Sequence, residues 1–126
     1  MATISSVKGT RPLPSPIVGN GVVHNFSWTG LGAGDDGAPI ELNGAVVDFV
    51  VQAVGVFSGG ATVALEGSND GVNWTTMKDE TGTAIDLGQN DLAGVSVIPA
   101  LMRPVVQSGD GGADIDVSAI LRIAGD

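Results

Sequence analysis

The segment IDVSAILRI at residues 115–123 constrains the fold most strongly, because its apolar residues recur at every second position. Successive side chains of an extended strand point to opposite faces, so this period predicts a strand with one face toward a core. The expected inward row is Ile115, Val117, Ala119, Leu121 and Ile123. Ile120 interrupts the otherwise polar outward row, and we therefore expect it to contact another molecule.

The same period recurs in short segments that turn-forming residues separate. Residues 45–54 give the strongest signal, and both of their faces are partly apolar, which predicts a central strand. One face holds Val47, Phe49, Val51 and Ala53, and the other holds Val46, Asp48, Val50, Gln52 and Val54. About eight short strands and no convincing helix predict an all-β chain, an antiparallel β-sandwich of jelly-roll-like form. Its 126 residues fit one domain.

Several turns can be predicted from residue type alone. The stretch EGSNDGVNW at 66–74 predicts a hairpin, since Asn, Asp and Gly tolerate left-handed backbone geometry. The Asn-Gly pair within residues 40–47 predicts a second hairpin. Strands are also expected at 94–100 and 101–107. Proline has no backbone N–H to donate, so Pro99 is expected at a sheet edge or at the end of its strand, and Pro104 at an edge or at a bulge.

The first twenty residues differ from the rest, because three prolines alternate with other residues there. Proline and its predecessor favour extended geometry, which predicts an extended arm at 1–20 ahead of a β-sandwich domain at 21–126. The arm is either a free tail or a segment that lies on a neighbouring subunit. The expected interaction residues are Arg11, Pro12, Leu13, Pro14, Pro16, Ile17, Val18 and, in the domain, Ile120.

Charge excludes several partners. The formal charge is −9, with 14 acidic and 5 basic residues, so nucleic-acid backbones and anionic membranes would be repelled. The longest apolar run, 45–57, is broken by Asp48 and Gln52, and the start has no apolar core typical of a signal peptide. We expect synthesis in a host cytoplasm. Charged residues make up only 15% of the chain, which favours burial against neighbouring protein.

The chain has few residues of the kinds that carry out catalysis or bind metal ions. His24 is the only histidine, lies on an apolar row and is expected to be structural, and there is no cysteine. The acidic loops at 32–38 and 108–116 match no calcium-binding loop, although carboxylates in a turn can hold a cation. We predict no catalytic, cofactor-binding or metal-binding residue. Trp28 and Trp74 are expected to pack in the core.

Two stretches resemble the small β-rich virion proteins of tailed bacteriophages: GGATVALEGSNDGVNWTTM at 59–77 and LMRPVVQSGDGGADIDVSAILRI at 101–123. Similar proteins of such phages are head decoration (cement) proteins and some tail components. The resemblance implies a non-enzymatic protein on the capsid surface of the virion. Its implied partners are the major capsid protein and further copies of itself, as a homotrimer.

Two alternatives stay open at this point. One is another virion component: a tail-tube, tail-terminator or head–tail joining protein. The other is a host-surface or carbohydrate-binding module, which requires Trp28 or Trp74 to be exposed on a rim.

Overall fold

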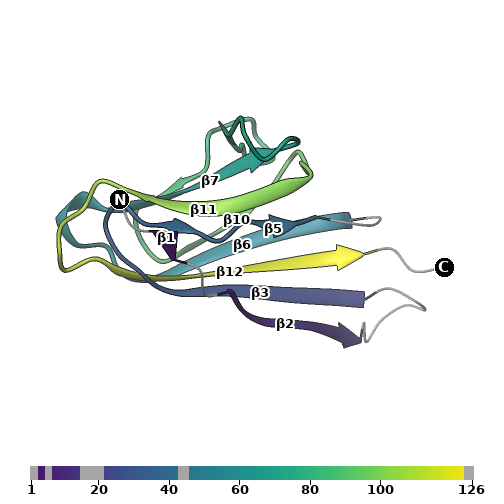
Figure 1. Ribbon diagram of the computed structural model, residues 1–126, viewed down its shortest axis with the longest axis horizontal. Coiled ribbons are helices and arrows are strands. Elements are labelled where there is room, and N and C mark those ends of the chain that lie inside the picture. Colours follow the sequence, from purple (N-terminus) through teal and green to yellow (C-terminus); the bar gives the residue numbers. More distant parts are fainter. Residues whose placement is uncertain (1–2, 5–6, 15–21, 43–45, 124–126) are drawn as a thin grey trace.

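The computed structural model describes the backbone of residues 3–4, 7–14, 22–42 and 46–123, and the side chains of residues 25–42 and 49–122. The described residues form twelve strands in two sheets that lie face to face (Figure 1). The expected all-β, antiparallel sandwich is therefore confirmed. Within the described ranges, no helix has the length and apolar character needed to cross a membrane.

One sheet has five strands in the order β10-β6-β12-β3-β2, and every neighbouring pair is antiparallel. Its strands are β2 (Val7–Pro14), β3 (Val22–Leu31), β6 (Val46–Val56), β10 (Asp91–Gly94) and β12 (Asp114–Ile123). The strands predicted at 45–54 and 115–123 are thus β6 and β12, and both lie inside this sheet with a neighbour on each side.

The other sheet has seven strands, with β11 and β7 at its centre. Its strands are β1 (Thr3–Ile4), β4 (Asp36–Gly37), β5 (Ile40–Glu41), β7 (Thr62–Ser68), β8 (Thr75–Thr76), β9 (Asp86–Leu87) and β11 (Leu101–Gln107). The pair β1–β4 is parallel and the other pairs described in this sheet are antiparallel. The turn at residues 58–60 is a single 3₁₀ turn, η1 (Ser58–Gly60).

The strand order is that of a jelly roll. The short strands β4 and β5 both pair with β11, and β8 and β9 both pair with β7, so each couple is one interrupted strand. From β3 onward this leaves about eight main strands, in the order 1-8-3-6 in one sheet and 2-7-4-5 in the other. Most connections consequently cross from one sheet to the other.

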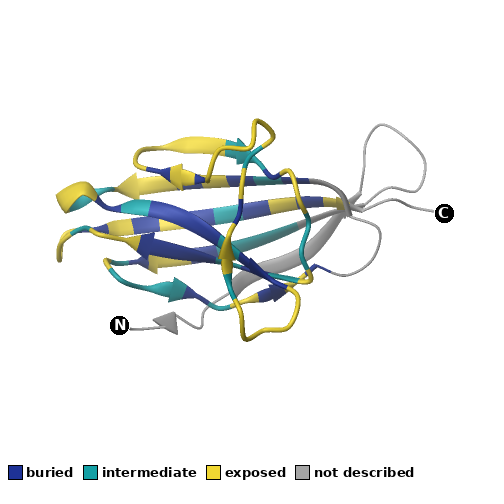
Figure 2. Cartoon of the chain, turned by 90° about the horizontal axis from the view of Figure 1, so that it is seen from above, coloured by how far each residue is buried: buried dark blue, intermediate teal, exposed yellow. Residues whose placement is uncertain are grey.

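One apolar row of each long strand fills the space between the sheets. The largest fully buried side chains include Trp28, Leu31, Phe49, Leu65, Met102 and Ile115. Buried and exposed residues alternate along β6 and β12 (Figure 2), which confirms the inward row expected for β12 wherever its side chains are described, and shows that Phe49, Val51 and Ala53 form the buried face of β6. Burial of this surface, at roughly 25 cal/mol per Å², is the main term that stabilises the fold.

Crossing connections overturn the second expected hairpin. Residues 40–41 form β5, which pairs with β11, whereas β6 begins at Val46 and pairs with β12 in the opposite sheet. The Asn-Gly pair at 43–44 lies outside the described residues. Local turn chemistry predicted pairing here, but the jelly-roll topology sends the two strands to different sheets.

The prediction that Pro104 marks a sheet edge is wrong, whereas the bulge alternative is supported, because residues 37–39 lie opposite only residues 103–104 there. Pro104 lies in the middle of β11, opposite Leu65 of β7, with β4 and β5 on the other side. Strand β5 pairs at 101–102 and β4 pairs at Val105, so the second ladder is interrupted at Pro104, where no N–H is available to donate. Pro99 lies outside the strands. Of the strand expected at 94–100, only Gly94, in β10, and Val95, in an isolated bridge to Asp79, are paired, and residues 96–100 form a loop.

Part of the expected arm belongs to the sandwich. Residues 7–14 form β2, the edge strand of the five-stranded sheet, with Arg11 opposite Asn25 and Pro12 opposite His24 of β3. Pro16, Ile17 and Val18 lie outside the described residues. The division of the chain at residue 20 therefore stays a prediction.

Candidate functional site

The outer face of the five-stranded sheet exposes apolar side chains in its middle. Val50 of β6 lies directly opposite Ile120 of β12, and Ile120 lies opposite Asn25 of β3. Val50 is half-buried, and Ile120 is 37% exposed. The neighbouring exposed residues are Val54, Val56 and Leu92. We call Val50, Val54, Leu92 and Ile120 the apolar outer face.

This sheet is also nearly neutral, whereas the chain as a whole is strongly acidic. Its five strands contain three basic residues, Lys8, Arg11 and Arg122, and four acidic residues, Asp48, Asp91, Asp114 and Asp116. The remaining two basic and ten acidic residues lie in the other sheet, the loops and the termini. A protein that covered this sheet would remove few charged groups from water, so the desolvation cost would be lower here than on the other sheet.

A polar atom of the same face lacks a partner. The Oδ1 atom of Asn25 is buried, and no described residue donates a hydrogen bond to it. An unpaired buried acceptor costs about 1–3 kcal/mol. The atom lies next to the Val50–Ile120 pair in the sheet register.

The outer face of the seven-stranded sheet has a different character. Glu66 of β7 lies opposite both Arg103 of β11 and Thr76 of β8. Arg103 donates from Nε and Nη2 to Glu66 Oε1 at 3.0 and 2.8 Å. Its Cζ atom lies 4.1 Å from the centroid of the Trp74 ring, a cation–π contact. We call Trp74, Arg103, Glu66 and Thr76 the tryptophan platform.

The turn before Trp74, with the sequence SNDG at residues 68–71, is held by hydrogen bonds among its own residues. Asp70 Oδ1 accepts hydrogen bonds from the backbone N–H groups of Val72 and Asn73, both at 2.8 Å, and from Ser68 Oγ at 2.9 Å. The backbone N–H of Asn73, followed by that of Val72 and by the Asn73 and Ser68 side chains, holds the pKa of Asp70 well below its ordinary value. The carboxylate thus closes the β7–β8 turn, and this expected hairpin is confirmed.

Asp79 and Asp110 also accept hydrogen bonds from residues of the turns around them. Asp79 Oδ1 accepts from the Thr81 hydroxyl at 2.6 Å and from the Thr83 N–H at 3.1 Å, bonds that lower its pKa. Hydrogen bonds from the Ser58 side chain and the Gly112 N–H lower the pKa of Asp110. Among the residues with described side chains, no three His, Cys, Asp or Glu residues form a group that could hold a metal ion.

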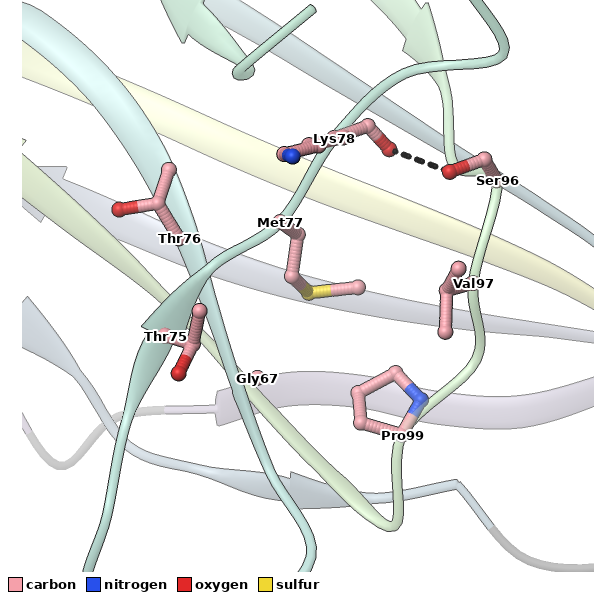
Figure 3. Close-up of a pocket in the computed structure, with 8 residues that line it drawn as sticks. All are labelled: Gly67, Thr75, Thr76, Met77, Lys78, Ser96, Val97 and Pro99. Atoms are coloured by element: carbon pink, nitrogen blue, oxygen red, sulfur yellow. Dashed lines mark hydrogen bonds between the residues drawn. The ribbon is translucent and has the colours of Figure 1, made fainter. Parts of the chain in front are cut away.

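An apolar pocket of about 210 Å³ is lined by residues of β7 and β8 and of the loop after β10 (Figure 3). Met77, Val97 and Pro99 converge on it, and Ser96 Oγ donates to the carbonyl oxygen of Lys78 across its rim at 3.2 Å. Gly67 forms its floor, where a Cβ would lie 2.7 Å from Pro99 Cγ. The pocket is continuous with the core, because Met77 is buried.

The two tryptophans differ in how far they are buried. Trp28 is fully buried and donates from Nε1 to the carbonyl oxygen of Ala38 at 2.9 Å, as expected for a core residue. The expectation that Trp74 packs in the core is wrong, because Trp74 is half-buried on an outer face, against Arg103. The side chain of His24 lies outside the described residues, although its backbone belongs to β3.

The predicted interaction residues come together only in part. Arg11, Pro12, Leu13 and Pro14 lie on β2, and Ile120 lies two strands away on β12. Sequence reasoning missed Leu92, because residues 91–94 were not expected to form a strand. It also missed the Trp74–Arg103 contact, since no local signal links residues of separate strands.

Solved structures that are distantly similar to this chain include two carbohydrate-binding modules. No family model matches the chain, and no curated protein matches it. A carbohydrate-binding module of Clostridium perfringens, CpGH89CBM32-5, in complex with GalNAc-β-1,3-galactose, is 16% identical with a TM-score of 0.34, and the match covers 85% of this chain and 69% of that one. The module CBM6cm-2 of Cellvibrio mixtus lichenase 5A, in complex with cellotriose, is 12% identical with a TM-score of 0.30, covering 96% and 91%. Likenesses at these scores carry no argument about what this chain binds.

Proposed function

We propose that the chain is a non-enzymatic virion protein that decorates and stabilises the head of a tailed bacteriophage. In this proposal the apolar outer face of the five-stranded sheet binds the major capsid protein. The observation that carries it is the Val50–Ile120 pair, an apolar contact row in the middle of a nearly neutral sheet on an otherwise acidic molecule.

Support also comes from the resemblance of residues 59–77 and 101–123 to small phage virion proteins. A stable contact of standard size covers about 800 Å² on each partner, and its centre is usually apolar and low in charge. The middle of the five-stranded sheet has this composition.

Strand β2 gives the proposal a second element. It holds Arg11 and Leu13 at the edge of the same sheet, beside β3. A trimer around a local symmetry axis of the shell would let these edge positions meet a neighbouring copy. The homotrimer is part of the proposal and follows from the resemblance.

The test measures binding to expanded, empty heads that lack this protein. Ile120→Asp places a charge in the middle of the apolar outer face, and we expect at least about a tenfold loss of affinity. Val72→Asp is the matched control, because Val72 is 77% exposed but lies in the β7–β8 turn, away from this face. Circular dichroism would show that both variants fold.

A companion measurement removes residues 2–18 and follows decoration and folding together. Weaker decoration by a folded protein would support a role for β2 and the arm. Unchanged affinity of the Ile120→Asp variant would refute the docking face, and localisation of the protein to tails by electron microscopy would refute the head assignment.

A further inference from the structure

We propose that the tryptophan platform on the seven-stranded sheet is a binding site for neutral saccharides. The site is independent of the proposed docking face, because it lies on the opposite outer face of the sandwich. A head-bound molecule would therefore present it to the surroundings. Nothing in the proposed decoration function requires Trp74 to be half exposed.

The aromatic part of the site is held rigidly. The Asp70-centred turn fixes the chain just before Trp74, and Asn69 Oδ1 accepts from the Ala100 N–H at 3.0 Å, which ties that turn to the segment before β11. Arg103 packs over the ring with its Cζ 4.1 Å from the centroid. Trp74 is only half-buried, so part of its ring surface is left uncovered by Arg103, and an exposed aromatic surface is a suitable partner for the C–H face of a pyranose.

The polar part of the site suits hydroxyl groups. Both hydrogen bonds from Arg103 to Glu66 end on Oε1, and among the described residues no hydrogen bond to Oε2 is present. Glu66 Oε2 can accept from a hydroxyl and Arg103 Nη1 can donate to one. Thr76, exposed and opposite Glu66, adds a group that does both. Paired donors and acceptors beside an aromatic ring recognise a sugar better than an apolar ligand.

The charges of the site and of the chain favour neutral sugars over acidic ones. Glu66 neutralises Arg103 at 2.8 Å, and the chain carries a formal charge of −9. An acidic sugar would gain little from the paired guanidinium and would be repelled by the carboxylates nearby. The geometry therefore favours neutral hexoses over uronic or sialic acids.

The experiment uses the full chain and two matched ligands, lactose and sialyllactose, with chitotriose and maltotriose as further neutral probes. Binding is followed by calorimetry and by the change in tryptophan emission. We expect at least one neutral probe to bind, sialyllactose to bind less tightly than lactose, and Trp74→Ala to lose at least about tenfold in affinity. Trp74→Phe, which keeps a ring, should lose less.

Two controls separate the site from the fold and from decoration. Val72→Ala changes an exposed residue of the same turn and should bind as the parent does. Trp74→Ala should still decorate heads. Absence of binding to all the neutral probes, equal binding by Trp74→Ala, or a preference for sialyllactose would overturn the proposal and leave the decoration function untouched.

Discussion

Gly37 of β4 packs so closely on Pro104 of β11 that a Cβ on Gly37 would lie 2.6 Å from Pro104 Cγ. It would also lie 2.8 Å from Cδ1 of the buried Trp28. Because Gly37 has no side chain, the Pro104 ring fits against it. This contact lies where the ladder beside β11 is interrupted.

Gly37→Ala should therefore destabilise the protein by about 1–3 kcal/mol, the usual cost of overpacking a core. Urea unfolding followed by circular dichroism measures the change. Gly111→Ala is the matched control, because no atom lies within 4 Å of a Cβ at Gly111. Equal stability of the two variants would show that the contact relaxes without cost.

The β7–β8 turn predicts a pH dependence. Hydrogen bonds hold the pKa of Asp70 below its ordinary value of 3.8, so its ionised form stabilises the fold above that pH. The contribution is lost as the pH falls from 3.8 through the lower pKa of the folded state. Asp70→Asn should lower Tm at neutral pH, and the difference from the parent should shrink below pH 3.8.

Thermal unfolding of both proteins between neutral and strongly acidic pH tests this turn. Asp79 and Asp110 have lowered pKa values for similar reasons and shift both curves alike. A Tm difference that stays constant across the range would show that the Asp70 charge is not what holds the turn.

The Arg103–Glu66 ion pair should make a small, measurable contribution. The two side chains are 24% and 22% exposed, so water screens the pair only in part. A double-mutant cycle with Glu66→Gln and Arg103→Met should give a coupling energy near the upper end of the range for surface pairs, about 0.5–1 kcal/mol. The coupling should fall with added salt, and a value independent of salt would indicate packing rather than charge.

The two tryptophans should be spectroscopically distinct. Trp28 is fully buried and Trp74 is half-buried at the surface, so acrylamide should quench only part of the emission. Trp74→Phe should leave a blue-shifted emission that acrylamide hardly quenches. Efficient quenching of the remaining emission would contradict the burial of Trp28.

Much of the sandwich could be predicted from local pattern. The two-residue period correctly implies the burial of alternate residues: Phe49, Val51 and Ala53 in β6, and Val117, Ala119 and Leu121 in β12. A strand shows its inward face in sequence because each side chain alternates with its neighbour. The β7–β8 hairpin was equally legible, since its turn is closed by its own Ser68 and Asp70 side chains.

What the sequence determined alone is therefore the strongly alternating strands such as β6 and β12, the buried face of β12 and the self-closing β7–β8 turn, because alternation and turn chemistry act over a few residues. The tertiary structure decided which strands pair. It sent β5 and β6 to opposite sheets, placed Pro104 in the middle of one, set Ile120 against Val50 and brought Arg103 onto Trp74. These relations join residues far apart in the chain, and they depend on the packing of two sheets over one core, which no local pattern encodes.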